Sequence, residues 1–102
     1  MSEGTPASGF SLADGGARWV FAGQLVFDNA ETVLEAAREL PLPAGGQVDL
    51  SGLGHADSSA LAVLLALRRR AAAERKALAY ASMPPLLASL ARVYGVDELI
   101  GV

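Results

Sequence analysis

The sequence predicts a single α/β domain in which helices pack on one small mixed β-sheet. Short segments with apolar or alternating residues are typical of strands, and longer segments carry apolar residues at helical spacing. The two kinds of segment alternate along most of the chain, which favours a layered α/β architecture. A chain of 102 residues, 52% of them hydrophobic and 19% charged, suffices for one hydrophobic core and not for two.

The first part of the chain predicts a β-hairpin. We expect residues 1–9, which are rich in Ser, Gly, Thr and Pro, to form a flexible segment, and the domain to span residues 10–102. Two short segments, Phe10–Leu12 and Arg18–Phe21, are typical of strands. Asp14-Gly15-Gly16 lies between them, and such residues favour a tight turn because they tolerate positive φ angles.

A helix and a central strand follow. Asp28 resembles a helix N-cap, and Glu31 three residues later completes a capping-box pattern. Apolar residues then recur at helical spacing until Pro41, which ends the helix. Gln47–Leu50 alternates apolar and polar residues, so we expect it to be a central strand.

The second helix is predicted over Ser58–Lys76. Projection at 3.6 residues per turn gives it a face directed toward the sheet, formed by Ala60, Val63, Leu64, Leu67 and Ala71. The opposite face carries Ala62, Leu65, Ala66, Arg69 and Ala73. Small apolar residues on an outward face indicate a docking surface. An alanine-rich sequence with a relaxed surface is the equally weighted alternative.

The last part predicts one more strand and helix. Ala77–Ser82 alternates in part and is expected to be a strand, and Pro84-Pro85 opens a third helix. The apolar stripe of that helix extends to Tyr94. We expect the tail Asp97–Val102 to pack against the domain, with a last strand as one option. Trp19 is expected in the core or on a sheet face.

Composition excludes several classes of function. A net charge of −3 and few aromatic residues argue against nucleic-acid binding. The chain has no cysteine, which excludes disulfides and zinc–thiolate sites and agrees with a cytoplasmic location. Residues 1–9 lack the features of a signal peptide, and no apolar run is long enough to cross a membrane. We therefore expect no membrane insertion.

No stretch of the sequence resembles an active site. Gly52-Leu53-Gly54 lacks the lysine of a phosphate-binding loop and the spacing of a dinucleotide-binding one. His55 is the only histidine and has no second base or metal-ligand cluster. Asp49 fits the strand pattern and is interpreted as structural. We expect neither an enzyme nor a bound metal or cofactor.

The polar turn predicted at Gly54–Ser59 is the strongest candidate site, because it joins a strand to a helix N-terminus. Ser58 or Asp57 can cap the helix there. The same turn can contact a partner, and these two interpretations overlap. We predict partner contacts at the turn and on the outward helix face by His55, Asp57, Ser58, Ser59, Ala62, Leu65, Ala66 and Arg69. Arg69 suits an acidic partner.

The stretch from Val48 to Leu65 resembles the signature of STAS domains, the family of anti-sigma-factor antagonists and cytoplasmic domains of sulfate transporters. In that family a strand ends in Asp-Leu-Ser and a helix begins with Asp-Ser-(Ser/Thr)-Gly-Leu. Here the corresponding segments are Asp49–Ser51 and Asp57–Leu61, and Gly23-Gln24-Leu25 stands where the family has Gly-Glu-Leu. The resemblance covers most of the chain and implies a STAS-type fold over residues 10–102.

Within this family, the chain is most similar to the STAS subunit of the Mla phospholipid-transport ABC system. The similarity lies in Asp57–Ala62 and in the terminal pattern from Pro84 to Leu99. It implies a non-catalytic subunit that binds the cytoplasmic ATPase, supports assembly and activity of the transporter, and is held near the inner membrane by its partner. An isolated chain could form a homodimer through the same apolar face.

The alternative implied by the family is an anti-sigma-factor antagonist whose binding is switched by phosphorylation of Ser58. Phosphate at this helix N-terminus would meet backbone donors but also the charge of Asp57. Phosphorylated members of the family carry Gly where this chain has Ala60. The methyl group of Ala60 leaves a kinase less room to approach the backbone. A nucleotide- or lipid-binding sensor is a third class that the sequence neither supports nor excludes.

Overall fold

The structure is a computed structural model, and it describes residues 8–101. Residues 1–7 of the expected flexible segment lie outside the described residues. Gly9, which was assigned to that segment, is the first residue of a strand. The first strand therefore includes one residue of the segment that we expected to be flexible.

The sheet is mixed, as predicted, and has four strands in the order β1-β2-β3-β4. They are β1 (Gly9–Ala13), β2 (Arg18–Leu25), β3 (Gln47–Ala56) and β4 (Ala79–Ala81). β1 pairs antiparallel with β2 through the predicted turn at Asp14–Gly16. β2–β3 and β3–β4 are parallel, since helices connect these strands.

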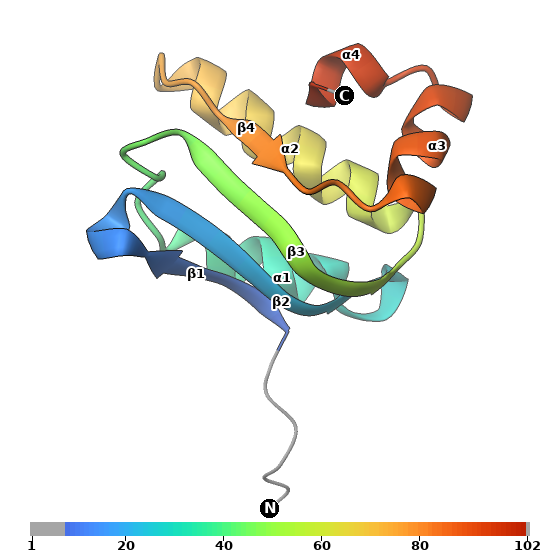
Figure 1. Cartoon of the computed structure of the whole chain (residues 1–102), viewed down its shortest axis with the longest axis horizontal. Coiled ribbons are helices and arrows are strands. Elements are labelled where there is room, and N and C mark those ends of the chain that lie inside the picture. The colour runs from blue at the N-terminus through green and yellow to red at the C-terminus, as the bar shows by residue number, and fades with distance from the viewer. Residues whose placement is uncertain (1–7, 102) are drawn as a thin grey trace, which may run out of the picture.

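Four helices complete the domain: α1 (Phe27–Arg38), α2 (Ser59–Ala73), α3 (Pro85–Val93) and α4 (Asp97–Ile100). α1 and α2 lie side by side on one face of the sheet, and α3 and α4 lie beyond β4 next to α2 (Figure 1). α2 is therefore flanked by α1 on one side and by the α3–α4 pair on the other.

The core lies between the sheet and the helices. All five residues predicted to face the sheet from α2 are buried: Ala60, Val63, Leu64, Leu67 and Ala71. Trp19 is fully buried, as predicted, and its indole N–H donates to the carbonyl of Pro41 at 2.9 Å. Phe10 closes the β1 end of this core, because its ring packs 5.4 Å from that of Trp19 and 4.9 Å from that of Phe21.

β3 is longer than predicted, and Gly54–Ala56, the first half of the expected turn at Gly54–Ser59, belongs to this strand. The strand continues to Ala56 because β2 continues to pair with it, with Gly52 opposite Ala22 and Leu53 opposite Gly23. A register shift inserts one extra residue into β3 before Gly52, which is a β-bulge. The glycines that suggested a turn instead let two strands approach closely.

The cap predicted for α1 and the optional last strand are also corrected. Asp28 does not cap α1: Val26 holds the N-cap position, and its N–H donates to the side chain of Asn29 at 2.9 Å. The optional last strand is absent from the described residues, because residues 97–100 form α4. Ile100 of this short helix is fully buried, so the expectation that the tail packs against the domain is confirmed.

Replacing Gly52 with Ala should lower stability by about 2 kcal/mol, because a strained contact in a packed region costs that order of energy. A Cβ at this position would lie 2.3 Å from the backbone oxygen of Phe21. Gly54→Ala is the matched control, since its Cβ would meet nothing closer than 3.7 Å. Urea denaturation of both variants tests this, and equal stabilities would contradict the close approach.

Candidate protein-interaction site

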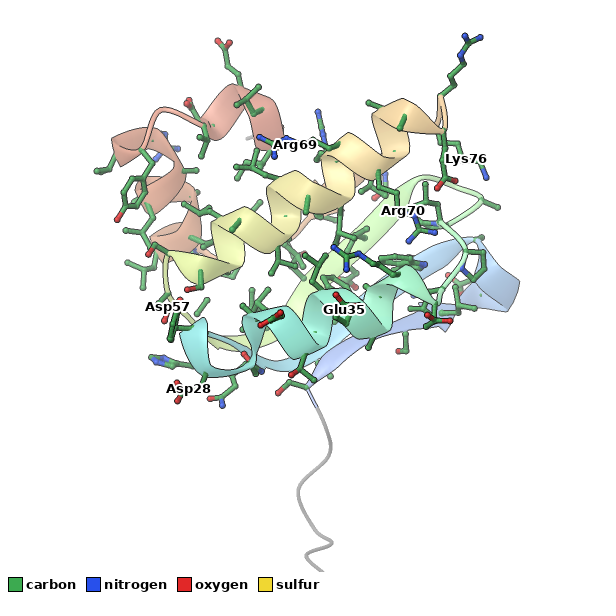
Figure 2. All side chains as sticks on the ribbon, turned by 180° about the vertical axis from the view of Figure 1, so that it is seen from behind. Asp28, Glu35, Asp57, Arg69, Arg70 and Lys76 are labelled. Carbon is green, nitrogen blue, oxygen red and sulfur yellow. The ribbon has the colours of Figure 1, made fainter. Side chains whose placement is uncertain are left out.

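The junction of β3 and α2 is organised by the carboxylate of Asp57. Its Oδ1 accepts a hydrogen bond from the backbone N–H of Ser59 at 2.8 Å, and its Oδ2 accepts one from Phe27 at 3.1 Å. Ser59 and Phe27 are the first residues of α2 and α1. One side chain therefore satisfies N-terminal donors of both helices and holds the two ends together (Figure 2).

The same hydrogen bonds set the charge state of Asp57. The backbone N–H groups of Phe27 and Ser59 stabilise the carboxylate and lower the pKa of Asp57 below its ordinary value, and the nearby His55 contributes a smaller part. The partial positive charges of two helix N-termini directed at this carboxylate also lower its pKa. Asp57 is therefore an anionic cap for both helices.

Ser58 is left free by this arrangement. The sequence allowed either Ser58 or Asp57 to cap α2, and the carboxylate of Asp57 makes the hydrogen bond while the side chain of Ser58 makes none. Ser58 is exposed at the helix N-terminus. Its hydroxyl is thus accessible to a partner or to a modifying enzyme.

His55 lies on β3 and not in a turn. It is exposed and lines a polar hollow of about 350 Å³ together with Gln24, Asp28 and Asp57. Within residues 8–101 there is no group of His, Asp and Glu side chains suited to a metal ion. We assign this hollow no catalytic chemistry.

The outward face of α2 is exposed at Ala62 and Arg69 and half-buried at Leu65 and Ala66. A hollow of about 280 Å³ borders it on the α3 side and is lined by Ser58, Leu61, Ala62, Leu65, Tyr94 and Val96. A second hollow of about 270 Å³ lies toward α4 and is lined by Leu65, Arg68, Arg69, Ala72 and Leu99. The predicted residues of α2 therefore border two apolar hollows.

Sequence reasoning missed two residues beside this face. Tyr94 belongs to the predicted apolar stripe of the third helix, yet its side chain is 59% exposed, and Leu99 of α4 is 58% exposed. The available signal for Tyr94 was the length of the apolar stripe, which extends beyond the residues that the core buries. We define the α2 surface as Ser58, Ala62, Leu65, Ala66 and Arg69 together with Tyr94 and Leu99.

The three consecutive arginines of α2 have different environments. Arg68 donates to the carbonyl of Leu78 at 2.8 Å. Arg70 donates to the carbonyls of Ala37 and Leu40 at 3.1 and 2.7 Å, at the C-terminal end of α1. Arg69 is exposed and makes no side-chain hydrogen bond or ion pair within residues 8–101 (Figure 2). It is the arginine available to a partner.

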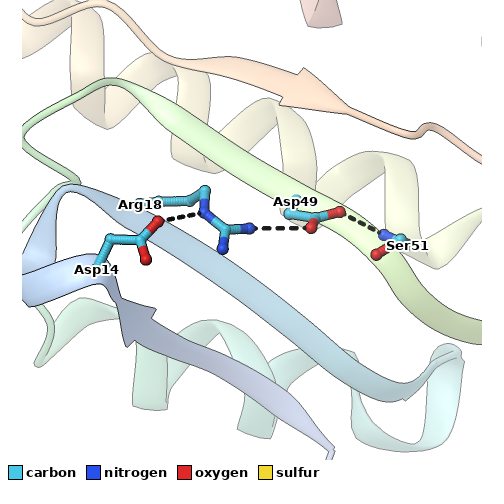
Figure 3. Close-up of polar contacts among 4 residues, drawn as sticks. All are labelled: Asp14, Arg18, Asp49 and Ser51. Carbon is cyan, nitrogen blue, oxygen red and sulfur yellow. Dashed lines mark hydrogen bonds and ion pairs between the residues drawn. The ribbon is translucent and has the colours of Figure 1, made fainter.

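Asp49 belongs to a different surface. On the sheet face away from α1 and α2, Arg18 donates to Asp14 at 2.9 Å and to Asp49 at 3.0 Å, and the other oxygen of Asp49 accepts the N–H of Ser51 at 2.8 Å (Figure 3). The Ser51 hydrogen bonds, followed by the charge of Arg18, lower the pKa of Asp49. These contacts support its interpretation as a structural residue.

Comparison with known proteins identifies one family. Residues 9–101 match the family model described as "Mlab, STAS domain", which is nearly the whole described chain. No curated protein matches the sequence closely enough to count as a relative. Among the described residues, no helix is both long and apolar enough to cross a membrane.

Asp57→Ala should lower the urea midpoint at neutral pH, because two helix N-termini lose their acceptor. The folded-state pKa of Asp57 lies below its ordinary value of 3.8. The contribution of the Asp57 carboxylate to stability is therefore complete above its ordinary pKa. It is lost as the pH falls through the lower folded-state pKa.

The stability difference between wild type and Asp57→Ala should consequently shrink below about pH 4. Asp49 titrates in both proteins, so its effect on stability cancels in this difference. Ser58→Ala is the control and should stay within about 0.5 kcal/mol of wild type, as expected for an exposed residue without a hydrogen bond. A difference that is independent of pH would contradict the assigned role of the carboxylate.

Proposed function

Because the chain belongs to the Mlab-type STAS-domain family, we propose that it is a non-catalytic subunit of a phospholipid-transport ABC transporter. In this proposal it binds the cytoplasmic ATPase of an Mla-type system that maintains outer-membrane lipid asymmetry. It supports assembly and activity of the transporter and is located at the inner membrane through its partner. STAS domains are generally non-catalytic.

The observation that supports this proposal is the α2 surface. Its central residue Ala62 is small and exposed, so the backbone of a partner can approach α2 closely. Tyr94 and Leu99 add large apolar side chains beside it, and aromatic residues often anchor protein interfaces. Arg69 supplies an uncommitted positive charge for an acidic group of the partner.

The backbone beneath this surface is fixed before binding. Asp57 ties α2 to α1 at their N-terminal ends, and Arg70 ties α2 to the C-terminal end of α1. A rigid surface loses little conformational entropy on association. Binding to an ATPase can change its activity only if the subunit has different affinities for two states of the ATPase. Lipid need not contact this chain.

The alternative is an anti-sigma-factor antagonist in a partner-switching pathway. The exposed hydroxyl of Ser58 favours it, because a kinase can reach this side chain and phosphate would add about two negative charges to the same surface. The fully buried Ala60 occupies the position where phosphorylated members carry Gly. Repulsion from Asp57 further opposes a stable phosphate at this site.

Affinity purification from native membranes with mass spectrometry tests the proposal. Tagged wild type should recover an ABC ATPase and its permease. Ala62→Glu should lower that recovery at least about tenfold, because a glutamate placed in an apolar contact is buried without a partner. Ala36→Glu, an exposed alanine on α1 outside the α2 surface, should bind normally.

Two results would contradict the transporter-subunit proposal. One is recovery of the ATPase by Ala62→Glu at the wild-type level. The other is recovery of a soluble histidine-kinase-like protein that Ser58→Asp loses, which would assign the chain to partner switching. Retention of the ATPase by Ser58→Asp would separate the two mechanisms further.

A further inference from the structure

The groove between α1 and α2 has a volume of about 590 Å³. Its apolar lining consists of Phe27, Ala30, Leu34, Ala62 and Val63. Phe27 is 79% exposed although it is the first residue of α1. An exposed phenylalanine beside an apolar groove is typical of a site that a partner covers.

The groove is held open by the contacts at its two ends. Asp57 joins the N-termini of the flanking helices, and Arg70 joins α2 to two carbonyls at and just beyond the C-terminal end of α1. The backbone N–H of Phe27 is fixed by its hydrogen bond to Asp57, while the side chain of Phe27 stays exposed to solvent. The groove is therefore preformed and does not depend on a conformational change.

The charges along the groove are of one sign. Asp28 and Glu31 are the only charged residues that line it, and neither forms an ion pair within residues 8–101. Glu35, farther along α1, forms an ion pair with Arg38. An occupant must therefore present apolar groups to the floor and positive charge to the α1 side.

We propose that the α1–α2 groove binds an amphipathic helix of a partner protein, with its apolar side against Phe27 and basic residues beside Glu31. A helix suits the site because the groove is formed by two helices and has small side chains, Ala30 and Ala62, that allow close approach. A second copy of the chain is disfavoured, since a symmetric contact would bring like charges together. Anionic lipid headgroups are repelled by the same acids.

This inference concerns the flank of α2 opposite α3, which shares only Ala62 with the α2 surface, and it does not depend on the identity of the transporter ATPase. A dye-labelled amphipathic peptide of leucine and lysine, about 18 residues long so that it forms a helix, is titrated with the full chain by fluorescence anisotropy. The matched peptide replaces lysine with glutamate. Affinity purification with Arg69→Glu reports separately on the α2 surface, because Arg69 is exposed there and does not line the groove.

The leucine–lysine peptide should bind saturably and at least about tenfold more tightly than the leucine–glutamate peptide. Phe27→Ala and Glu31→Lys should each weaken binding at least about fivefold, which corresponds to loss of a central interface contact. Leu86→Ala, 62% exposed on α3, and Glu39→Lys, just after α1, are the matched controls and should remain within about twofold of wild type.

Absence of saturable binding would overturn the proposal. So would an equal effect of Glu39→Lys and Glu31→Lys, because net charge alone would then explain the binding. Sedimentation velocity completes the test: a wild-type dimer that Phe27→Ala converts to a monomer would assign the groove to a second copy and contradict the proposed occupant.

Discussion

The hydrogen bonds that Asp57 accepts from Phe27 and Ser59 are the constraint on which the rest of the site depends. They combine two tasks that usually need two residues, since one carboxylate caps α2 and also fixes the start of α1. With these donors satisfied, the hydroxyl of Ser58 remains uncommitted at the surface. The carboxylate of Asp57 is therefore committed to holding the two helices together, whereas its exposed neighbour Ser58 is not.

The arginines of α2 show the same division of roles. Arg68 and Arg70 donate to backbone carbonyls of neighbouring segments, so they hold α2 to β4 and α1, whereas Arg69 between them faces solvent. Because successive residues of a helix point about 100° apart, one run of identical side chains serves two flanks and one outer face. α2 is thereby presented with apolar surface on both sides of an exposed ridge at Ala62.

Much of this arrangement could be predicted because the inward face of α2 is set by helical periodicity alone, and the burial of Leu64 and Leu67 follows that pattern. The extent of β3 could not be predicted in this way. Gly52 and Gly54 have the local character of a turn, and only pairing with β2 makes them strand residues. The prediction of the α1 cap failed for a related reason. The carboxylate of Asp57, which accepts the N–H of Phe27, lies 30 residues away in sequence. The exposure of Phe27 likewise depends on how α1 meets α2, which local sequence does not encode.

The central claim is that the ridge of α2 at Ala62 contacts the ATPase of a lipid transporter, and site-specific photo-crosslinking tests it most directly. A photoreactive residue placed at position 62 should crosslink to the ATPase in native membranes, while the same residue at the exposed position 22 of β2 should not. Crosslinks to the ATPase from position 22 alone, or crosslinks from position 62 only to another class of protein, would contradict the account.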